Sequence, residues 1–333
     1  MKPTIEDVAA LAGVSRGTVS RVLNGGPVSR ASAERVHAAI AETGYRAHHS
    51  ARSLAGGRSG VYAAVISEPY GELFEDPTFG LLLRGISSQL TGAVHTSPDV
   101  SLSLVLITDE EERRRADRLL DPRRVDGVIL LSPHVHDPIL GSIDPSLPVV
   151  VCGELDEPRD LTWSVTIDDA HGGAAGARHL LQRGVRCPAI IGGPLAARGA
   201  LRRVHAQQTE LGDLLDPALL VHANYAASGG VEAMRELLVR DPGIDAVLCG
   251  SDRQAVGALQ VLLESGRSVP DDVAIVGFDD QRFAATTSPP LTTINQPITE
   301  VGAVAARTLA AHLRGEEVSD QTLPTSLVIR SSA

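Results

Sequence analysis

A chain of 333 residues, of which 43% are hydrophobic, is long enough for two or three domains that each bury a core. Its mean hydropathy is +0.05, no apolar run reaches the length of a membrane span, and no basic-then-apolar signal opens it, which predicts a cytoplasmic protein. The three cysteines, Cys152, Cys187 and Cys249, have no C-x-x-C spacing and argue against a disulfide framework or a thiolate zinc site.

The net charge of −11 is divided unevenly along the chain. Residues 1–60 contain eight Lys and Arg against four Asp and Glu, a balance of +4, whereas the remainder contains 22 against 37, a balance of −15. A basic N-terminal segment on an acidic body keeps affinity for phosphate local and limits nonspecific binding by the body.

The first two dozen residues predict two short helices that flank a tight turn. Thr4 is placed to cap the first helix, Asp7 completes a capping box, and Gly13 ends the helix. The apolar face of this helix consists of Val8, Leu11 and Ala12. Ser15 is placed to cap the second helix. The inward face of the second helix consists of Val19, Val22 and Leu23.

The other side of the second helix collects hydrogen-bond donors and cations: Arg16, Gly17, Thr18, Ser20 and Arg21. Such a helix fits the major groove of DNA, where its N-terminal amides bind phosphate and arginine side chains read guanine O6 and N7. The alternative is a solvated helical hairpin with ordinary surface arginines. Because capping, turn and cation placement agree with one another, the sequence favours a DNA-reading helix-turn-helix.

A third helix is predicted from its cap Ser29 to Gly44, with Val36 and Ile40 facing inward. Three helices in so short a stretch bury little surface, so this headpiece is expected to be only marginally stable alone. Glycine and serine in residues 56–60 then indicate a flexible joint.

After residue 60, short apolar strands alternate with amphipathic helices. The expected strands are 61–66, 102–107, 128–131, 149–152, 189–191, 220–223, 246–249 and 273–278, and the expected helices are 79–90, 110–120, 201–211, 229–239 and 252–264. This alternation implies doubly wound parallel sheets covered on both faces, and the number of strands favours two α/β lobes that divide near 163–165. Ligands of such sheets bind beyond the carboxyl ends of the strands, so we expect an effector between the lobes.

The headpiece resembles the lactose-repressor (LacI-type) family of bacterial transcription regulators. The resemblance rests on Thr4-Ile-x-Asp7-Val-Ala, Ala12-Gly-Val-Ser15-x-x-Thr18-Val-Ser-Arg21-Val-Leu-Asn24, Gly44-Tyr45-Arg46 and Ala51-Arg52-Ser53-Leu54, and it extends more weakly to the C-terminus. The resemblance implies a hinge helix from Tyr45 onwards, with Leu54 inserted into the minor groove. It adds Asn24, Tyr45 and Arg52 to the expected DNA contacts. Thr4 and Ser15 are also expected to contact DNA. Ala47-His48 and Ala55 depart from the residues common in the family.

The resemblance also implies the domain organisation. Residues 1–45 are expected to form a small all-α helix-turn-helix domain, residues 46–60 a hinge helix and linker, and residues 61–333 an effector-binding domain built like a periplasmic binding protein. The first lobe is expected to take 61–163 plus 294–325, and the second 164–293 plus 326–333.

Candidate effector contacts come from the positions of residues at strand ends and from the family resemblance. Asp279 follows a predicted strand directly, where its carboxylate can accept two sugar hydroxyls; the alternative role for Asp279 or its neighbour Asp280 is a helix cap. By the resemblance, Arg203 grips the ligand and Tyr225 stacks on its apolar face. The resemblance further adds Thr78, Phe79 and Ser251, the last at a position where the family often has Asn.

Other motifs are weak. Arg198 and Arg202 are alternatives to Arg203, and Asp252 is expected to cap a helix. His134-x-His136 with Asp137 has metal-binding residue types but reads as an exposed loop. The run Gly172-Gly173-Ala-Ala-Gly176 does not fit a dinucleotide-binding fingerprint, and neither a P-loop nor a G-x-S-x-G elbow is present, so no cofactor, metal or catalytic residue is predicted.

The sequence therefore predicts a DNA-binding transcription regulator without enzyme activity, acting as a repressor on a pseudo-palindromic operator under control of a small molecule, most simply a sugar. No leucine heptad follows the last strand, which favours a homodimer over a tetramer. The alternatives are a sugar-handling enzyme, such as a kinase, and a sugar-binding transport protein on the same α/β scaffold.

Overall fold

The computed structural model describes residues 3–23, 26–45, 59–68, 70–91, 100–134, 139–155 and 159–333. They fall into two compact units, one formed by Met1–Val61 with Arg123–Asp126 and the other by Tyr62–Pro122 with Gly127–Ala333. None of the helices in these segments has both the length and the apolar character needed to cross a bilayer.

The N-terminal unit contains the helices α1 (Ile5–Ala12), α2 (Arg16–Leu23) and α3 (Arg30–Thr43). The predicted capping box is confirmed, because Thr4 Oγ1 accepts from the Asp7 amide at 3.3 Å and Asp7 Oδ2 accepts from the Thr4 amide at 2.8 Å. Gly13 ends α1 in the left-handed conformation, with φ 61°. Ser15 Oγ accepts from the Thr18 amide at 3.2 Å, so Ser15 caps α2 as predicted.

A small apolar cluster holds the three helices together: Val8, Ala9, Ala12, Val19, Val36, Ala39 and Tyr45. Leu11 was predicted to face inward, but 48% of it is exposed, because the apolar side of α1 is formed by Val8, Ala9 and Ala12. Tyr45, predicted as a DNA contact, is only 8% exposed and contributes its ring to this cluster.

The first lobe of the larger unit is built on a six-stranded sheet in the order β11-β5-β4-β3-β1-β2. Its strands are β1 (Val61–Ile66), β2 (Ser101–Leu106), β3 (Gly127–Leu131), β4 (Val149–Cys152), β5 (Thr162–Ile167) and β11 (Gln321–Leu323). The helices of this lobe are α5 (Tyr70–Glu75), α6 (Pro77–Thr91), α7 (Glu110–Leu119), α8 (Ile139–Ser142) and α13 (Ile298–Leu313). The strand at which the lobes were expected to divide, β5, lies wholly in this sheet, paired parallel to β4.

The second lobe repeats this plan with the strand order β12-β10-β9-β8-β6-β7. Its strands are β6 (Pro188–Gly192), β7 (Leu220–His222), β8 (Ala246–Cys249), β9 (Ala274–Asp279), β10 (Thr292–Asn295) and β12 (Ser326–Val328), and β12 runs antiparallel to β10. The covering helices are α9 (Asp169–Gln182), α10 (Arg198–Leu211), α11 (Ala227–Arg240) and α12 (Asp252–Glu264). Short 3₁₀ turns lie at Gly212–Leu214, Pro217–Leu219 and Arg282–Ala285.

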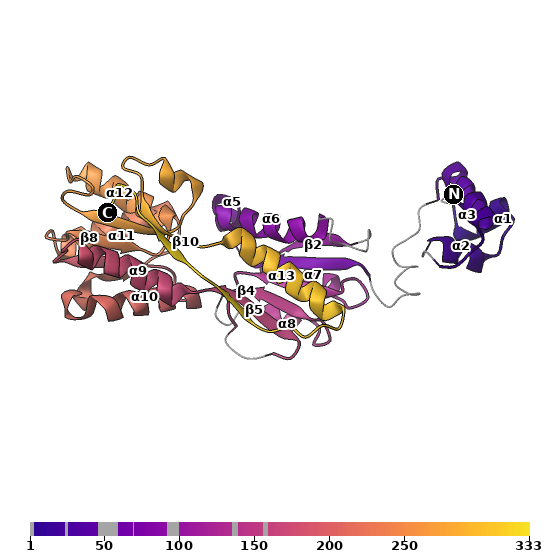
Figure 1. The fold of residues 1–333 in the computed structure, drawn as a ribbon. Coiled ribbons are helices and arrows are strands. Elements are labelled where there is room, and N and C mark those ends of the chain that lie inside the picture. The colour runs from indigo at the N-terminus through magenta and orange to yellow at the C-terminus, as the bar shows by residue number, and fades with distance from the viewer. Residues whose placement is uncertain are drawn as a thin grey trace. The chain divides into compact units, whose positions relative to one another are not determined.

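The chain passes between the lobes after β5, after β10 and again between β11 and β12. The helix α13 therefore packs on the first lobe although it follows the last parallel strand of the second, and Figure 1 shows it beside α6. Two glycines permit the close approach, since a Cβ on Gly85 would lie 1.9 Å from the Thr299 carbonyl oxygen and one on Gly302 would lie 2.2 Å from that of Leu82. The carboxyl ends of the parallel strands of both sheets then face the same cleft.

Candidate functional site

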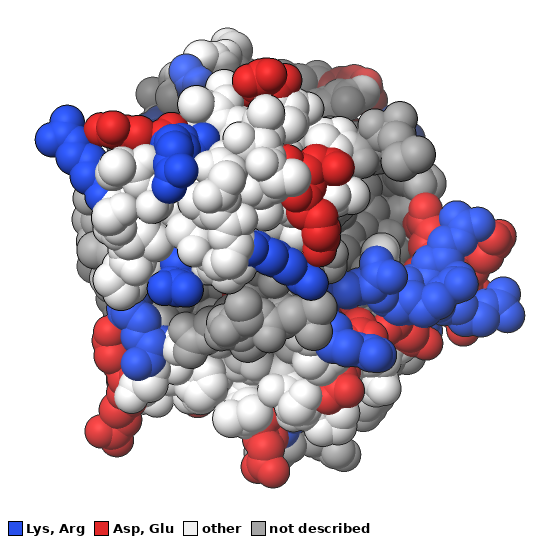
Figure 2. All heavy atoms as spheres, turned by 90° about the vertical axis from the view of Figure 1, so that its right-hand side faces the viewer, with Lys and Arg blue, Asp and Glu red and all other residues white. Residues whose placement is uncertain are grey.

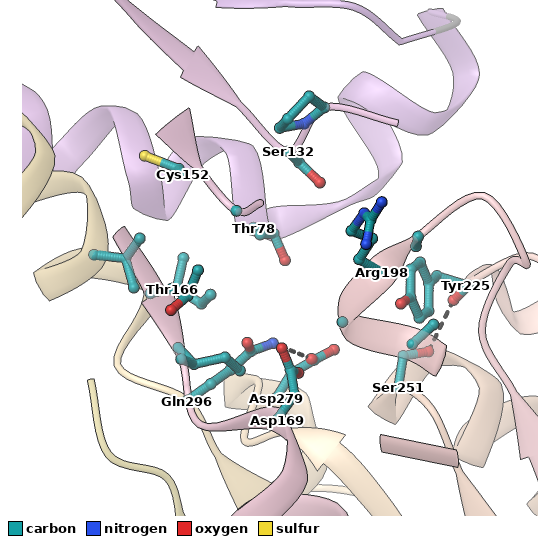
Figure 3. A pocket seen from close by; sticks show the side chains of 18 of the residues that line it. Thr78, Ser132, Cys152, Thr166, Asp169, Arg198, Tyr225, Ser251, Asp279 and Gln296 are labelled. Atoms are coloured by element: carbon teal, nitrogen blue, oxygen red, sulfur yellow. Dashed lines mark hydrogen bonds between the residues drawn. The ribbon is translucent and has the colours of Figure 1, made fainter. Parts of the chain in front are cut away.

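A cavity of about 420 Å³ lies between the two lobes (Figure 3). It is lined by all six residues predicted to contact an effector: Thr78, Phe79, Arg203, Tyr225, Ser251 and Asp279. Their segments are up to 201 positions apart, since Thr78 opens α6 and Asp279 ends β9. Pockets of this size, about 300 to 1,000 Å³, typically enclose small molecules.

The two walls of the cavity differ in chemistry. The second lobe supplies polar groups, among them Asp169, Arg203, Asn224, Tyr225 and Asp279. The first lobe supplies apolar side chains together with Glu68, Asp76, Thr78, Ser132, His134, Glu154 and Thr166; the apolar ones are Phe79, Leu82, Cys152, Val165, Ile167, Ile298 and Val301. A ligand with one hydroxylated side and one less polar side matches this division.

Arg203 is held by contacts that sequence reasoning did not find. Its Nε donates to Asp169 Oδ1 at 2.5 Å, its Nη1 donates to the Gly250 carbonyl at 2.8 Å, and its guanidinium carbon lies 3.7 Å from the centre of the Phe278 ring. Burial, the largest single influence, would lower the pKa of Arg203, but the Asp169 carboxylate, Tyr225, Asp279 and the hydrogen bond to Asp169 together raise that pKa. Arg203 is therefore positively charged and held in place, with Asp169 as its counter-ion.

Close packing of α9 on α10 brings Asp169 to Arg203. A Cβ on Gly173 would lie 2.5 Å from the Arg203 carbonyl oxygen, and one on Gly199 would lie 2.7 Å from Asp169 Oδ2. The glycine run near residue 172, which did not fit a nucleotide-binding loop, thus serves helix packing. A Cβ on Gly172 would lie 2.9 Å from the Phe278 ring.

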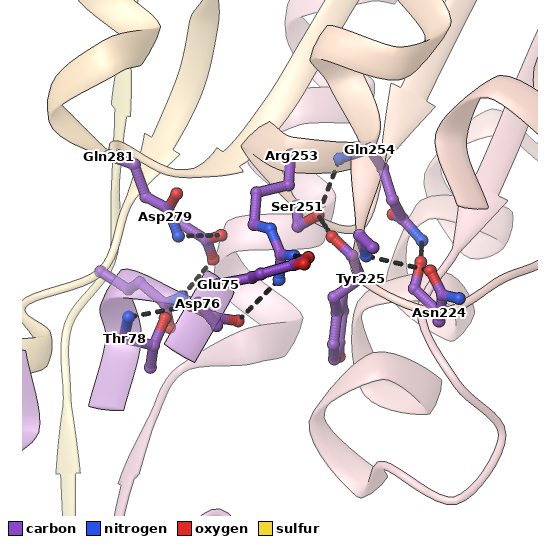
Figure 4. Close-up of polar contacts among 12 residues, drawn as sticks. Glu75, Asp76, Thr78, Asn224, Tyr225, Ser251, Arg253, Gln254, Asp279 and Gln281 are labelled. Carbon is purple, nitrogen blue, oxygen red and sulfur yellow. Dashed lines mark hydrogen bonds and ion pairs between the residues drawn. The ribbon is translucent and has the colours of Figure 1, made fainter. Parts of the chain in front are cut away.

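Asp279 places its carboxyl group in the cavity, with the side-chain amides of Gln296 (Figure 3) and Gln281 (Figure 4) donating to it. Burial raises the pKa of Asp279 well above its usual value, and the nearby Asp252 carboxylate raises it further. Its φ is +117°, which is uncommon for a residue with a side chain, and such strained positions cluster at ligand sites. Asp279 does not cap a helix, and the 3₁₀ turn that follows begins after Gln281.

The prediction that Asp252 caps a helix is wrong. Ser251 caps α12 by accepting from the Gln254 amide at 3.0 Å, and its hydroxyl donates to the Tyr225 carbonyl at 3.0 Å. Asp252 is fully buried, where it accepts from Thr293 Oγ1 at 2.5 Å and from the Gln281 amide at 2.8 Å. Burial raises the pKa of Asp252 to about 7.

Tyr225 presents its ring to the cavity next to Gly193, where a Cβ would lie 2.5 Å from the ring. Burial raises the pKa of Tyr225 to about 12, so its hydroxyl stays protonated at neutral pH. Tyr225 thus offers both an aromatic face and a hydrogen-bond donor.

Two arginines of the second lobe form ion pairs with the first lobe beside the cavity. Arg202 of α10 contacts Glu154, which follows β4, with 2.8 Å between Nη2 and Oε2. Arg253 of α12 contacts Glu75 at 3.3 Å and Asp76 at 3.5 Å, and Figure 4 shows these side chains meeting. No sequence pattern predicted these pairs, because their partners lie far apart along the chain.

The candidate metal motif is not assembled in the part of the chain that the structure describes. His134 Nε2 lies 2.8 Å from Glu68 Oε1, whereas His136 and Asp137 are outside the described residues. Among the described residues, no group of three or more metal-ligating side chains is present.

On the headpiece, Ser15, Arg16, Gly17 and Arg21 are exposed, and Thr18 and Ser20 are partly exposed. Arg16 Nη1 lies 3.4 Å from Glu6 Oε1, and Arg21 Nε donates to the Gly17 carbonyl at 3.2 Å. The predicted contacts Asn24, Arg52 and Leu54, with the expected hinge helix, lie outside the described residues.

The described headpiece residues 3–23 and 26–45 contain four arginines and four acidic residues, so they are neutral overall. The predicted excess of +4 comes from Lys2, Arg46, Arg52 and Arg58, outside the described residues. On the face shown in Figure 2, Lys and Arg side chains stand at several separate places, with Asp and Glu side chains close to many of them.

Comparison with known proteins decides the family. A model of bacterial regulatory proteins of the lacI family matches residues 4–48, and a model of the periplasmic binding protein-like domain matches residues 177–333. The HTH-type transcriptional regulator CelR of Thermobifida fusca is 38% identical over 99% of this chain and 98% of its own length. The chain belongs to the lacI family of bacterial regulatory proteins. The ribose operon repressor of Escherichia coli K12 is 32% identical over 98% of both chains.

Solved structures of this LacI-type fold agree. A CelR–cellobiose complex matches with a TM-score of 0.77 and 36% identity over 99% of this chain and all of the other. A Lac repressor dimer bound to operator and the anti-inducer ONPF matches with a TM-score of 0.84 and 27% identity over 100% and 99%. The predicted family and fold class are thus confirmed, and the chain is a DNA-binding transcription regulator, not an enzyme.

Proposed function

We propose that this LacI-family regulator is a cytoplasmic repressor that binds a pseudo-palindromic operator as a homodimer, and that a sugar in the interlobe cavity controls its affinity for DNA. The observation that carries this proposal is the cavity itself, in which Asp279, Tyr225 and the Asp169–Arg203 pair converge between two lobes of a chain with a lacI-type headpiece. CelR, the relative with 38% identity, has been solved with cellobiose.

The DNA-binding half of the proposal rests on α2. Its exposed Arg16, Gly17 and Arg21 can approach base edges, while its capped N-terminus presents amides to phosphate. The proposed contacts are Thr4, Ser15, Arg16, Gly17, Thr18, Ser20, Arg21, Asn24, Tyr45, Arg52 and Leu54. Because the described headpiece is neutral overall, Lys2 and residues 46–58 supply the positive charge that attracts the phosphate backbone.

The effector half rests on hydroxyl recognition by Thr78, Arg203, Ser251 and Asp279, with the Phe79 and Tyr225 rings against less polar faces. The domain division follows: residues 1–45 bind DNA, residues 46–60 form the hinge, and residues 61–333 bind the effector. A bound ligand changes DNA affinity only if it favours one lobe arrangement, typically by about 1 to 3 kcal/mol of coupling.

Selection of duplexes from random DNA by the full-length protein tests the first half, and a palindromic consensus is the expected result. Titration of that duplex with and without mono- and disaccharides then tests the second half. Absence of any sequence preference contradicts operator binding, and an affinity unaffected by every ligand that binds the protein contradicts effector control.

A further inference from the structure

The charges around the cavity restrict its ligand. Among the described residues, the lining contains five acidic side chains and two arginines: Glu68, Asp76, Glu154, Asp169, Asp279, Arg198 and Arg203. Charges inside a cleft with low-dielectric walls act strongly on a bound ion. Whether each charged group is already neutralised by a neighbouring residue therefore determines which charged ligands the cavity can bind.

Arg203 is buried, with 9% exposed, and already has its counter-ion. A phosphate or carboxylate bound beside its guanidinium would also lie beside Asp169, whose Oδ1 is 2.5 Å from Arg203 Nε. Arg198 also lines the cavity, and because it is exposed at the start of α10, water screens its charge.

Two further arginines near the cavity are paired with its acidic residues, Arg202 with Glu154 at 2.8 Å and Arg253 with Asp76 at 3.5 Å. His134 Nε2 lies 2.8 Å from Glu68 Oε1. An anionic ligand would have to displace one of these carboxylates to reach its cation. The apolar side chains that the first lobe contributes to the cavity, such as Phe79 and Leu82, cannot donate hydrogen bonds to the charged group of an anionic ligand.

Asp279 receives hydrogen bonds from the neutral amides of Gln281 and Gln296. A carboxylate has about four acceptor positions, so ligand hydroxyls can donate to those that remain.

We infer that the effector of this cavity is an uncharged saccharide, and that Asp169 sets this selectivity by neutralising Arg203, so that sugar phosphates and sugar acids are excluded. The inference rests on the proposed function only in taking the cavity as the effector site. It adds the charge class of the ligand and a specificity-determining residue.

Isothermal titration of the full-length protein in the absence of DNA tests the inference. The probes are neutral sugars with anionic counterparts: glucose with glucose 6-phosphate and glucuronic acid, ribose with ribose 5-phosphate, and cellobiose with cellobionic acid. We expect at least one neutral sugar to bind, and its anionic counterpart to bind at least about tenfold more weakly. Anionic probes that bind as tightly as the neutral ones, or a panel in which no neutral sugar binds, would overturn the inference.

The variant Asp169→Asn tests the role of Asp169, because it keeps the side-chain shape and leaves Arg203 without its counter-ion. We expect the neutral sugar to bind more weakly and the ratio between neutral and anionic affinities to fall at least about tenfold, with circular dichroism confirming the fold. The matched control Asp213→Asn, at an exposed site in the same lobe, keeps the wild-type ratio. An unchanged ratio in folded Asp169→Asn overturns the assignment. Because these titrations contain no DNA, failure of operator control remains a separate result.

Discussion

Glu154 of the first lobe and Arg202 of the second form an ion pair across the cleft, with 2.8 Å between Oε2 and Nη2. On another side of the cavity, Arg253 reaches Asp76 and Glu75. Both contacts join residues of different lobes, so they stabilise this arrangement of the lobes. The charged side chains of these pairs therefore hold the two lobes together.

Removal of the Glu154 charge should weaken effector binding modestly. Arg202 is 58% exposed at its side chain, and pairs of this kind contribute about 0.2 to 1 kcal/mol, so Glu154→Gln is expected to lower affinity by no more than about fivefold. The loss should disappear at high salt, which isothermal titration at two ionic strengths measures. The control Glu210→Gln breaks the Arg178–Glu210 pair within the second lobe. Equal losses in both variants would contradict a role in closure.

Arg21→Ala should lower operator affinity by about 1 to 3 kcal/mol, the value of a good arginine contact to a base. Arg21 is exposed on α2, and its Nε bond to the Gly17 carbonyl leaves other donors for DNA. Gel-shift titration of the selected duplex measures the change. Arg118→Ala, an exposed site on α7 of the body, is the control and should bind like wild type. Full affinity in Arg21→Ala would mean that α2 is not the reading helix.

Asp279→Asn should leave operator binding intact but abolish most of the response to effector, because the amide nitrogen cannot accept hydrogen bonds as both Asp279 oxygens do from Gln281 and Gln296. Titration of operator DNA at increasing effector concentration measures the response. A response curve like that of the wild type would remove Asp279 from the site.

The buried Asp252 predicts a pH dependence of stability. Its pKa rises from 3.8 to about 7 on folding because of burial, so between these values the folded state binds more protons than the unfolded state. Stability from this group therefore falls as pH rises from about 4 to about 7, by at most about 1.4 kcal/mol per pH unit. Thermal unfolding of wild type and Asp252→Asn at pH 5.5 and 7.5 checks the sign. Identical pH slopes in both proteins would show that Asp252 does not titrate in this range.

The sequence predicted those parts of the fold whose signals are local. Thr4, Asp7 and Gly13 lie within one helix length, and their capping pattern predicted the ends of α1 correctly. The strands β5 and β10 were missed because Thr162–Ile167 and Thr292–Asn295 are not the continuous apolar runs by which the other parallel strands were recognised. They become strands by pairing parallel to β4 and β9, which no short window of sequence reveals.

The same distinction applies to the cavity. Asp279 could be proposed from its place at a strand end, whereas Arg203, Tyr225 and Thr78 depended on the family resemblance. Asp169 was missed because it lies 34 residues before Arg203 and meets it only through the packing of α9 on α10. The ion pairs between lobes were missed for the same reason, since sequence does not give distances between distant carboxylates and arginines.

Gly173→Ala should disturb the effector site, although Gly173 does not line the cavity. The new Cβ would lie 2.5 Å from the Arg203 carbonyl oxygen, a backbone atom that cannot move without shifting α10. Overpacking of this kind typically costs about 1 to 3 kcal/mol, which outweighs the gain of about 1 kcal/mol in helix propensity. We expect a lower unfolding temperature and weaker effector binding, because α10 carries Arg203 away from Asp169. Gly141→Ala in α8 is the control, since nothing lies within 4 Å of its Cβ position. If Gly173→Ala bound effector as tightly as Gly141→Ala, the spacing of α9 and α10 would not control the Asp169–Arg203 contact.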